Sequence, residues 1–370
     1  MRVAGPMLNP MLIPGGRSIQ VLTHLIRTRK IPHAMLFTGI DGVGRYQTAI
    51  RLAMALNCTG QPDISTESDG QNTNGDSQDP AYWPVCGSCP ACRKIITGEH
   101  PDILSIQPAG NALKIDQIRS LCDTLALKPY DARYRFAILE KAQAMTLPAA
   151  NALLKMLEEP PARTTLILIA NKPSDLLPTI FSRCQHLRFP PLPEEQIARS
   201  IADSEGISEE ASRLIAAMAG GSHQTAREMD SGQWLRQRHW LMDELMQIHR
   251  GPAPDKTGST RRIMALADIL ARDPQHIFHL LGIMKSWLRD LAMVAFTPEH
   301  TINRDRTDQI KEVAASVPSQ TFVGSFEALE KIEKQILANA NPRLALETYL
   351  ATLAQNISTS GGLESIKNYG

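Results

Sequence analysis

Three cysteines, Cys86, Cys89 and Cys92, follow one another as C-x2-C-x2-C, and 27 residues separate Cys58 from the first of them. Four thiolates with tight spacings can surround a zinc ion tetrahedrally and stabilise a module that has too little core to fold alone. We therefore predict a structural zinc site on these four cysteines. His100 is an alternative to Cys58 as the fourth ligand because of the long spacing. Unrelated thiols are disfavoured by the Gly and Pro interleaved with the triplet.

The segment between Cys58 and the triplet has an unusual composition. Residues 60–80 contain five acidic side chains, no Lys or Arg, and Ile64 as the single aliphatic residue. Such a stretch cannot bury enough apolar surface to fold. We predict that 60–80 is a solvated, disordered insertion that can be deleted without damage to the core.

A second candidate for chemistry is the glycine-rich segment GIDGVGRY, at residues 39–46. A phosphate-binding loop, G-x-x-x-x-G-K-[ST], needs Gly for close backbone approach, Lys for the outer phosphates and a hydroxyl for magnesium. Arg45 stands here at the Lys position and Tyr46 at the hydroxyl position, while the glycines are kept at Gly39, Gly42 and Gly44. The segment either binds nucleotide or is a degenerate loop that joins a strand to a helix. We favour the degenerate loop.

A third candidate is the triplet Ser182-Arg183-Cys184, which ends a strand–helix–strand–helix pattern. The expected elements are at residues 136–139, 147–159, 164–170 and from Pro173 onward. The first helix has apolar residues at i, i+3, i+4 and i+7, and the second strand is apolar throughout, as in a parallel strand covered on both faces. The second helix would hold Arg183 at the surface of its domain.

The phrase ANALLKMLEEPP, the apolar strand and the phrase IFSRCQ together resemble the clamp-loader branch of the AAA+ proteins. The resemblance implies that Arg183, with Ser182, is an arginine finger that acts in trans at the ATP site of a neighbouring subunit. It also implies that Glu140 and Lys141 stand where other members carry two acidic residues, one for magnesium and one for water. Since a lysine cannot act as the water-activating carboxylate, we expect no ATP hydrolysis by this chain.

Two further positions of the resemblance concern nucleotide. Asn171 follows the apolar strand where the family senses the γ-phosphate, and we expect it to keep only a structural hydrogen bond. Gln224 stands where the family has an arginine that contacts nucleotide, although Arg227 lies one turn further on. We therefore expect that this chain does not bind ATP.

By this resemblance the chain is a non-hydrolysing subunit that assists ATP-dependent loading of a sliding clamp onto primed DNA. The implied partners are the ATPase subunits (gamma/tau) and a delta subunit in a hetero-pentamer, with the clamp and DNA reached through the complex. The isolated chain would catalyse nothing, although it would be part of a DNA-directed DNA polymerase (nucleotidyltransferase) holoenzyme. Two alternatives stay open, an active AAA+ ATPase and a zinc-dependent nucleic-acid-binding protein. The second lacks the basic and aromatic clustering that such sites use.

These residues require an α/β domain followed by helices. We predict a RecA-like AAA+ domain with a parallel sheet over 1–190, including the zinc module at 58–92, a helical lid over 191–250, and an all-helical collar for oligomerisation over 251–370. The 43% hydrophobic content is that of a globular protein, and the net charge of +1 argues against an overall electrostatic grip on nucleic acid. No apolar run approaches the ~20 residues that span a bilayer. Together with the cysteine spacing, this indicates a cytoplasmic protein, nucleoid-associated if it belongs to a replisome.

Overall fold

The computed structural model describes residues 16–60, 83, 85–202, 207–229, 232–249, 256–272 and 277–361. The chain forms two compact units. The sheet unit comprises Met1–Pro193 and Gly220–Thr225, and the helical unit comprises Glu194–Ala219 and Ala226–Gly370. Apart from Gly60, the predicted insertion at 60–80 lies outside the described residues.

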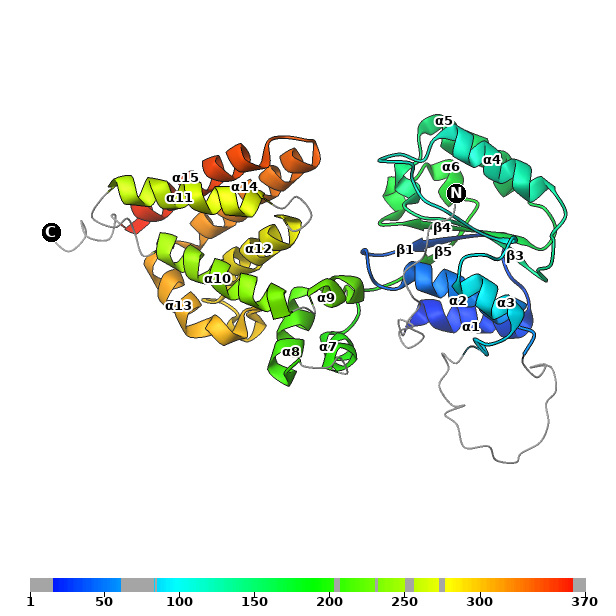
Figure 1. The fold of residues 1–370 in the computed structure, drawn as a ribbon, viewed down its shortest axis with the longest axis horizontal. Helices are drawn as coiled ribbons and strands as arrows, with labels where there is room; N and C mark the ends of the chain where they lie inside the picture. The colour runs from blue at the N-terminus through cyan, green and yellow to red at the C-terminus, as the bar shows by residue number, and fades with distance from the viewer. Residues whose placement is uncertain are drawn as a thin grey trace, which may run out of the picture. The chain divides into compact units, whose positions relative to one another are not determined.

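A five-stranded parallel sheet forms the centre of the sheet unit (Figure 1). Its strands are β1 (Ala34–Thr38), β2 (Ile103–Ile106), β3 (Arg135–Leu139), β4 (Thr164–Ala170) and β5 (Gln185–Arg188), in the order β2-β3-β4-β1-β5. The inner strands β3, β4 and β1 are buried along their whole length, which explains why their sequences are nearly continuous apolar runs. The predicted parallel α/β class is confirmed.

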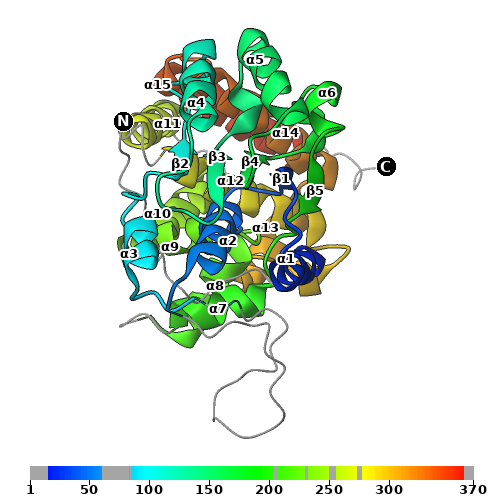
Figure 2. The same cartoon turned by 90° about the vertical axis from the view of Figure 1, so that its right-hand side faces the viewer.

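Helices cover both faces of this sheet, as Figures 1 and 2 show. One layer contains α1 (Arg17–Thr28), α2 (Arg45–Asn57) and α3 (Pro90–Ile96), and the other contains α4 (Ile115–Ala126), α5 (Leu147–Glu158) and α6 (Pro178–Phe181). Successive side chains of a strand point to opposite faces. In β1, Met35 and Phe37 pack with the core under α1 and α2, whereas Leu36 packs with the core under α4 and α5.

The segment that leads to Arg183 differs from the single helix expected from Pro173. It consists of a 3-10 turn, η2 (Pro173–Asp175), and the four-residue helix α6. Proline restricts the residue before it to extended backbone, so Pro178 holds Leu177 at ψ 137° and interrupts the helix there. The prediction of one continuous helix was therefore wrong, although α6 still places Arg183 directly after its end.

The described part of the helical unit contains helices joined by turns. Its helices are α7 (Glu194–Ala202), α8 (Glu209–Met218), α10 (Gly232–His249), α11 (Lys256–Ala271), α12 (Ile277–Met293), α13 (Thr307–Ser316), α14 (Ser319–Leu337) and α15 (Pro342–Gly361). The helix α9 (His223–Met229) begins in the last segment of the sheet unit and ends in the helical unit. The predicted C-terminal helical region is confirmed, while its division into a lid and a collar stays a prediction. Within the described residues, no helix has both the length and the apolar character needed to cross a membrane.

A buried polar network organises the centre of the helical unit. Arg238 of α10 is fully buried and donates to Asp305 at 2.7 Å and to Asn303 at 2.8 Å. Asp290 of α12 accepts the N–H of Asn303 at 2.8 Å. Because removing one partner would leave a buried charge without compensation, this network fixes α10, α12 and the turn after α12 in one arrangement.

Candidate functional site

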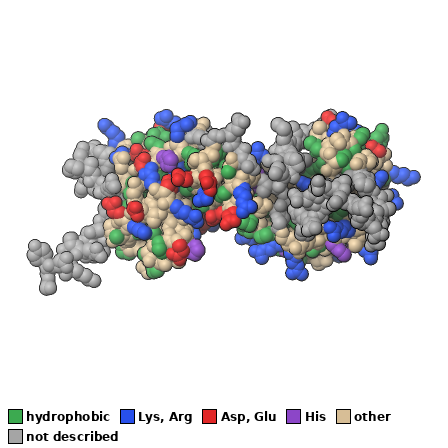
Figure 3. Space-filling view, turned by 90° about the horizontal axis from the view of Figure 1, so that it is seen from below, with side chains coloured by type: hydrophobic (Ala, Val, Ile, Leu, Met, Phe, Trp, Pro, Cys, Tyr) green, Lys and Arg blue, Asp and Glu red, His purple; other side chains and the backbone are tan. Residues whose placement is uncertain are grey.

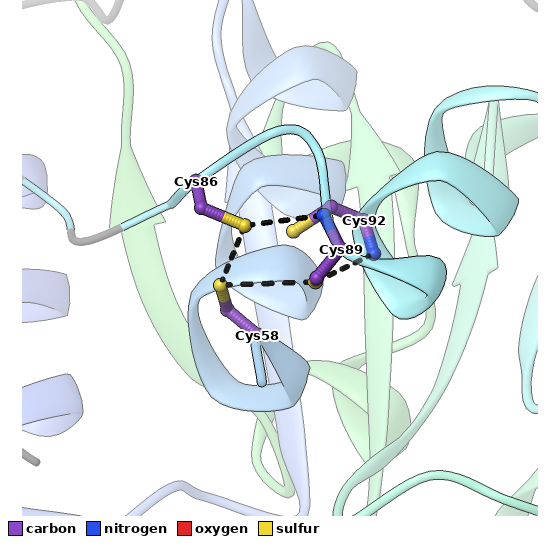
Figure 4. A group of neighbouring side chains, drawn as sticks. All are labelled: Cys58, Cys86, Cys89 and Cys92. Atoms are coloured by element: carbon purple, nitrogen blue, oxygen red, sulfur yellow. Dashed lines mark hydrogen bonds between the residues drawn. The ribbon is translucent and has the colours of Figure 1, made fainter. Parts of the chain in front are cut away.

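The four predicted zinc ligands meet at one point (Figure 4). The Sγ atoms of Cys58, Cys86, Cys89 and Cys92 all lie within 4.8 Å of one another. The Sγ atom of Cys58 is 3.5 Å from that of Cys86 and 4.0 Å from that of Cys89. A tetrahedral site with Zn–S bonds of about 2.3 Å places its sulfur atoms about 3.8 Å apart. The donor set and its spacing therefore fit a zinc ion whose four positions are all filled by sulfur.

Two helix ends hold these thiols. Cys58 ends α2, and Cys89 is the N-cap of α3, whose first turn carries Cys92. The N–H of Cys89 donates to Cys86 Sγ at 3.3 Å, and the N–H of Cys92 donates to Cys89 Sγ at 3.4 Å. Hydrogen bonds of this kind orient sulfur ligands from outside the coordination sphere.

The same hydrogen bonds decide which thiols ionise most readily. The N–H groups of Cys89 and Ser88 lower the pKa of Cys86. Burial alone would raise the pKa of Cys89, but N–H donors, that of Cys92 foremost, outweigh it and lower the pKa to about 5. Burial raises the pKa of Cys58 and of Cys92. A metal ion would therefore displace a proton more easily from Cys86 and Cys89 than from Cys58 and Cys92.

His100, the alternative fourth ligand, lies apart from this group. Its side chain is buried, and its Nδ1 atom accepts the N–H of Asp102 at 3.2 Å. The metal-binding group contains Cys58 and not His100. The long spacing in sequence does not keep Cys58 away, because closing a longer loop costs little additional entropy.

Two residues that the sequence analysis missed complete the module. A Cβ atom at Gly60 would lie 2.8 Å from Cys86 Sγ, so only glycine fits beside the cluster. Trp83 is 1% exposed and donates its indole N–H to Thr23 Oγ1 of α1 at 2.8 Å, which anchors the chain just before the triplet. A tryptophan at the end of an acidic, weakly apolar stretch was the signal that could have identified this anchor.

The glycine-rich loop is filled by one of its own side chains. Arg45 is 5% exposed and donates to the carbonyl oxygen of Ala170, to Asp41 Oδ1 at 2.5 Å and to Asn171 Oδ1 at 3.2 Å. Its guanidinium therefore ties the loop to the end of β4 instead of standing free for a phosphate. Asn171 serves as a hydrogen-bond acceptor here, in keeping with the structural hydrogen bond expected of it.

The segment Gly220–Thr225 packs on the same loop. The N–H of Gln224 donates to the carbonyl oxygen of Gly42 at 3.3 Å, and a Cβ atom at Gly42 would collide with Ser222 Oγ. Gly42 has a φ of 79°, a backbone conformation that favours glycine. The loop thus keeps its glycine-dependent shape while protein covers it at Gly42. The side chains of Gln224 and Arg227 are exposed.

Two of the three positions that the resemblance assigns to magnesium and water, those of Tyr46 and Lys141, carry unsuitable groups. Tyr46 is half-buried, and burial raises the pKa of its hydroxyl. The carboxylate of Glu140 accepts from Ser105 Oγ at 3.1 Å and from Gln107 Nε2 at 2.9 Å. Lys141 is exposed and has a left-handed φ of 49°. Of the two carboxylates that hydrolysis uses, only that of Glu140 is present.

Arg183 lies at the surface directly after α6. Its guanidinium donates to Glu158 Oε1 at 2.7 Å and to the carbonyl oxygen of Thr179 at 3.0 Å, and its side chain is 37% exposed. Ser182 is also exposed and donates to the carbonyl oxygen of Thr179 at 3.2 Å. An exposed ion pair such as Arg183–Glu158 contributes about 1 kcal/mol or less, so another anion can displace Glu158 at little cost.

Two family models match this chain. The model for "DNA polymerase III, delta subunit" matches residues 16–193, and the model for "DNA polymerase III, delta subunit, C terminal" matches residues 233–355. Together they cover well over half of the sequence. The chain belongs to the DNA polymerase III delta-subunit family. Its resemblance to the clamp-loader proteins, recognised above from short phrases, is thereby confirmed.

Relatives in this family include proteins named DNA polymerase III subunit delta'. That of Pseudomonas aeruginosa is 36% identical over 213 residues, which cover 56% of this chain and 58% of the relative. That of Bacillus subtilis is 33% identical over 202 residues, which cover 55% of each. The tau subunit of Bacillus subtilis is 27% identical over 358 residues. The match covers 91% of this chain and 59% of the tau subunit. The chain thus spans little more than half the length of these relatives.

A solved structure of a DNA polymerase III gamma-subunit-related protein from Thermotoga maritima is also similar. It has a TM-score of 0.46 at 18% identity, with 92% of this chain and 100% of that chain covered.

Proposed function

We propose that this chain is a non-hydrolysing subunit of the delta' type in a replicative clamp loader, and that it supplies Arg183 to the ATP site of a neighbouring subunit. One contrast carries the proposal. The phosphate loop is filled by Arg45 and covered by Gly220–Thr225, whereas Arg183 stands at the surface. A finger arginine on a chain that cannot hold ATP has a use only at the ATP site of another chain.

The partners in this proposal are ATPase subunits of the tau/gamma type and a delta subunit in a hetero-pentamer, acting in the cytoplasm at the replisome. The sliding clamp and primed DNA would be engaged through that complex. Relatives named delta' and tau support this assignment. In the same proposal the zinc module is structural, the lid spans 191–250, and the collar at 251–370 holds the subunits together.

The competing function is an active AAA+ ATPase, which would need ATP and magnesium in the loop. Three observations oppose it: the buried guanidinium of Arg45, the bulky phenol of Tyr46, and the missing carboxylate at Lys141.

The decisive experiment replaces the finger in an assembled loader. An arginine supplied in trans is worth ~10³-fold or more in phosphoryl-transfer rate. In loaders reconstituted with Arg183→Ala, we expect normal assembly and loss of DNA- and clamp-stimulated ATP hydrolysis at one site. The measurement is single-turnover hydrolysis alongside native mass spectrometry of the complex.

The matched control is Glu158→Ala, which breaks the same ion pair and keeps the guanidinium. If the pair serves only the fold, both variants should behave alike. If Arg183 is the finger, Glu158→Ala loaders should hydrolyse ATP at the unaltered rate while Arg183→Ala loaders do not. Unaltered hydrolysis with Arg183→Ala would refute the assignment.

A further inference from the structure

The core beneath α1 contains a side chain from a distant part of the sequence. Trp83 is 1% exposed and belongs to the same core as Ile19, Leu22 and Ile26, the apolar residues on the inner face of α1. Its indole N–H donates to Thr23 Oγ1 at 2.8 Å, and that hydroxyl donates to the carbonyl oxygen of Ile19 at 2.8 Å. Removing the indole would therefore leave a gap under α1 and a buried hydroxyl without its donor.

Trp83 lies outside the described helices and strands, so its position depends on the chain that follows it. Cys86 comes three residues later, and its Sγ atom is 3.5 Å from that of Cys58 at the end of α2. Val85, between Trp83 and Cys86, packs against the same core. Zinc held at the four cysteines would fix the backbone within three residues of the indole.

The chain that precedes Trp83 offers no equivalent anchor in its sequence. Twenty-four residues lie between Cys58 and Trp83, and residues 61–80 contain Ile64 as their single aliphatic side chain. An indole at the end of such a tether has to close a long loop when it inserts into the core. Coordination of Cys58 and Cys86 by one metal ion closes that loop beforehand, so insertion orders few further residues.

The position of α1 rests on the contacts of its inner face. Arg17, Gln20, His24 and Arg27 are exposed, and Figure 3 shows Lys and Arg side chains on this side of the sheet unit, at the right of the view. The N-cap residue Gly16 provides no side-chain cap. A helix of 12 residues is marginal on its own in water. Packing against the sheet unit, the buried indole included, therefore decides whether α1 is ordered.

A second hydroxyl connects α1 to the last strand of the sheet. Ser18 is buried, and its Oγ atom donates to the carbonyl oxygen of Arg188, where β5 ends. In the described sheet, β5 is an end strand that pairs with β1, and Arg188 lies opposite Thr38. Loosening of α1 would therefore also loosen the end of β5.

We propose that Trp83 makes the packing of α1 and β5 depend on zinc at the four cysteines. Filling the cluster fixes Cys86 and places the indole, which holds α1 and, through Ser18, the end of β5. Loss of the metal releases the indole. The core on the other face of the sheet contains neither Trp83 nor a residue of the cysteine cluster among its described members, so α4 and α5 keep their packing. Neither Arg183 nor a partner subunit enters into this role, which is independent of the proposed function.

The test is hydrogen–deuterium exchange of the full chain by mass spectrometry, with zinc bound and after zinc is removed with EDTA in reducing buffer. Amides of α1 and β5 should exchange about tenfold faster or more without zinc, since their local opening no longer has to expel a buried ring. Amides of α4 and α5 should keep their exchange rates.

Tryptophan emission follows the indole itself. Trp83 is the one tryptophan in the sequence of the sheet unit, the others being Trp234, Trp240 and Trp287. The difference in emission between the unaltered chain and Trp83→Phe should shift to the red when zinc is removed, because the ring then meets water.

Trp83→Ala separates metal binding from its effect on α1. The variant keeps all four cysteines, so at saturating zinc it should be fully loaded. Its α1 should nevertheless exchange as fast as in the zinc-free unaltered chain and respond no further to EDTA. Because the coupling is reciprocal, its zinc affinity should also fall about tenfold. The matched pair is Trp83→Phe, which loses the hydrogen bond to Thr23, and Trp287→Phe in α12, which should leave the zinc response of α1 unchanged.

Three results would overturn the proposal. Zinc removal that speeds exchange only in α3 and at the end of α2 would make the effect of the metal local. An equal loss of protection in α4 and α5 would show that the metal supports the whole sheet unit without Trp83 as the connection. A zinc response of α1 that persists in Trp83→Ala, or in Trp83→Phe if the alanine variant does not fold, would assign the coupling to another contact.

Discussion

The glycine-rich loop has arginine at the lysine position of the phosphate-binding motif, and the guanidinium of Arg45 occupies the loop itself. The guanidinium of Arg45 reaches the carbonyl oxygen of Ala170 and the amide oxygen of Asn171 at once, whereas an ammonium group offers a single compact charge. The residue types alone predicted a degenerate loop. They could not predict its acceptors, because Ala170 lies 125 residues further along the chain and meets Arg45 only through the parallel pairing of β1 with β4.

The isolated chain should therefore show no measurable ATP-magnesium binding in a calorimetric titration. Restoring the motif with Arg45→Lys and Tyr46→Thr should not recover tight binding, since Ser222 and Gln224 still pack against Gly42. Dissociation constants in the micromolar range for the unaltered chain would contradict this prediction.

Among the acidic residues of the sheet unit, Asp102 should contribute most to the free energy of unfolding. Asp102→Asn leaves Arg135 buried without its counter-charge, which should cost about 3–5 kcal/mol in the free energy of unfolding. Asp131→Asn is the control, because its exposed pair with Lys94 at 3.7 Å contributes about 1 kcal/mol or less. Urea unfolding of the three proteins measures both differences.

The difference in unfolding free energy between wild type and Asp102→Asn should change with pH in a definite direction. Burial alone would raise the pKa of Asp102, but the N–H donors of the Tyr130 loop and Arg135 outweigh it and hold the pKa below the ordinary 3.8. The native state therefore binds this proton more weakly than the unfolded chain does. Its contribution is complete above pH 3.8 and is lost as the pH falls toward the native pKa. The stability gap between wild type and Asp102→Asn should narrow in that range, and a constant gap would disprove the linkage.

At the scale of elements, local patterns predicted more than long-range packing did. A threonine before the first turn is a local signal for a helix start, and Thr146 caps α5 with its side chain accepting the N–H of Ala149 at 3.4 Å. The C-x2-C-x2-C spacing predicted the metal cluster, because these three ligands lie together in one loop and the first turn of α3. The fourth ligand, Cys58, could not be chosen over His100 from sequence, since the choice depends on where α2 ends in space. The break before α6 was missed because the apolar pattern outweighed Pro178 in the prediction.

The zinc module should fail as a unit when one ligand is lost. Cys89→Ser should abolish zinc content and lower the Tm by about 5 °C or more, because metal binding and folding of this module are coupled. Gly60→Ala should act in the same direction, since its Cβ atom would press on Cys86 Sγ at 2.8 Å. Cys122→Ser, a cysteine outside the group, should keep both zinc and Tm. Elemental analysis that finds no zinc in fresh, reduced protein would remove the assignment.

For the whole molecule, a net charge of +1 conceals a division of charge along the chain. Residues 60–80 carry five acids and no basic side chain, while 16–40 carry no acid. The overall net charge averages over these segments and so does not reveal how unevenly acidic and basic side chains are distributed.

Deleting residues 61–81 and joining the ends with a short Gly-Ser linker should leave Tm and zinc content unchanged. The deleted stretch has almost no apolar side chain to bury, and the fixed points on either side, Gly60 and Trp83, remain. A drop in Tm of more than about 2 °C, or failure to enter the loader, would show that the insertion has a structural use.

The sheet unit closes only with residues that are synthesised late. Gly220–Thr225, which covers Gly42, leaves the ribosome after all five strands and after α7 and α8 of the other unit. Since N-terminal domains begin to fold during synthesis at ~5–20 residues per second, the nascent sheet carries a bare phosphate loop for some seconds. Translation thus gives this chain a brief period in which its glycine-rich loop is uncovered at Gly42, and the emergence of Thr225 ends it.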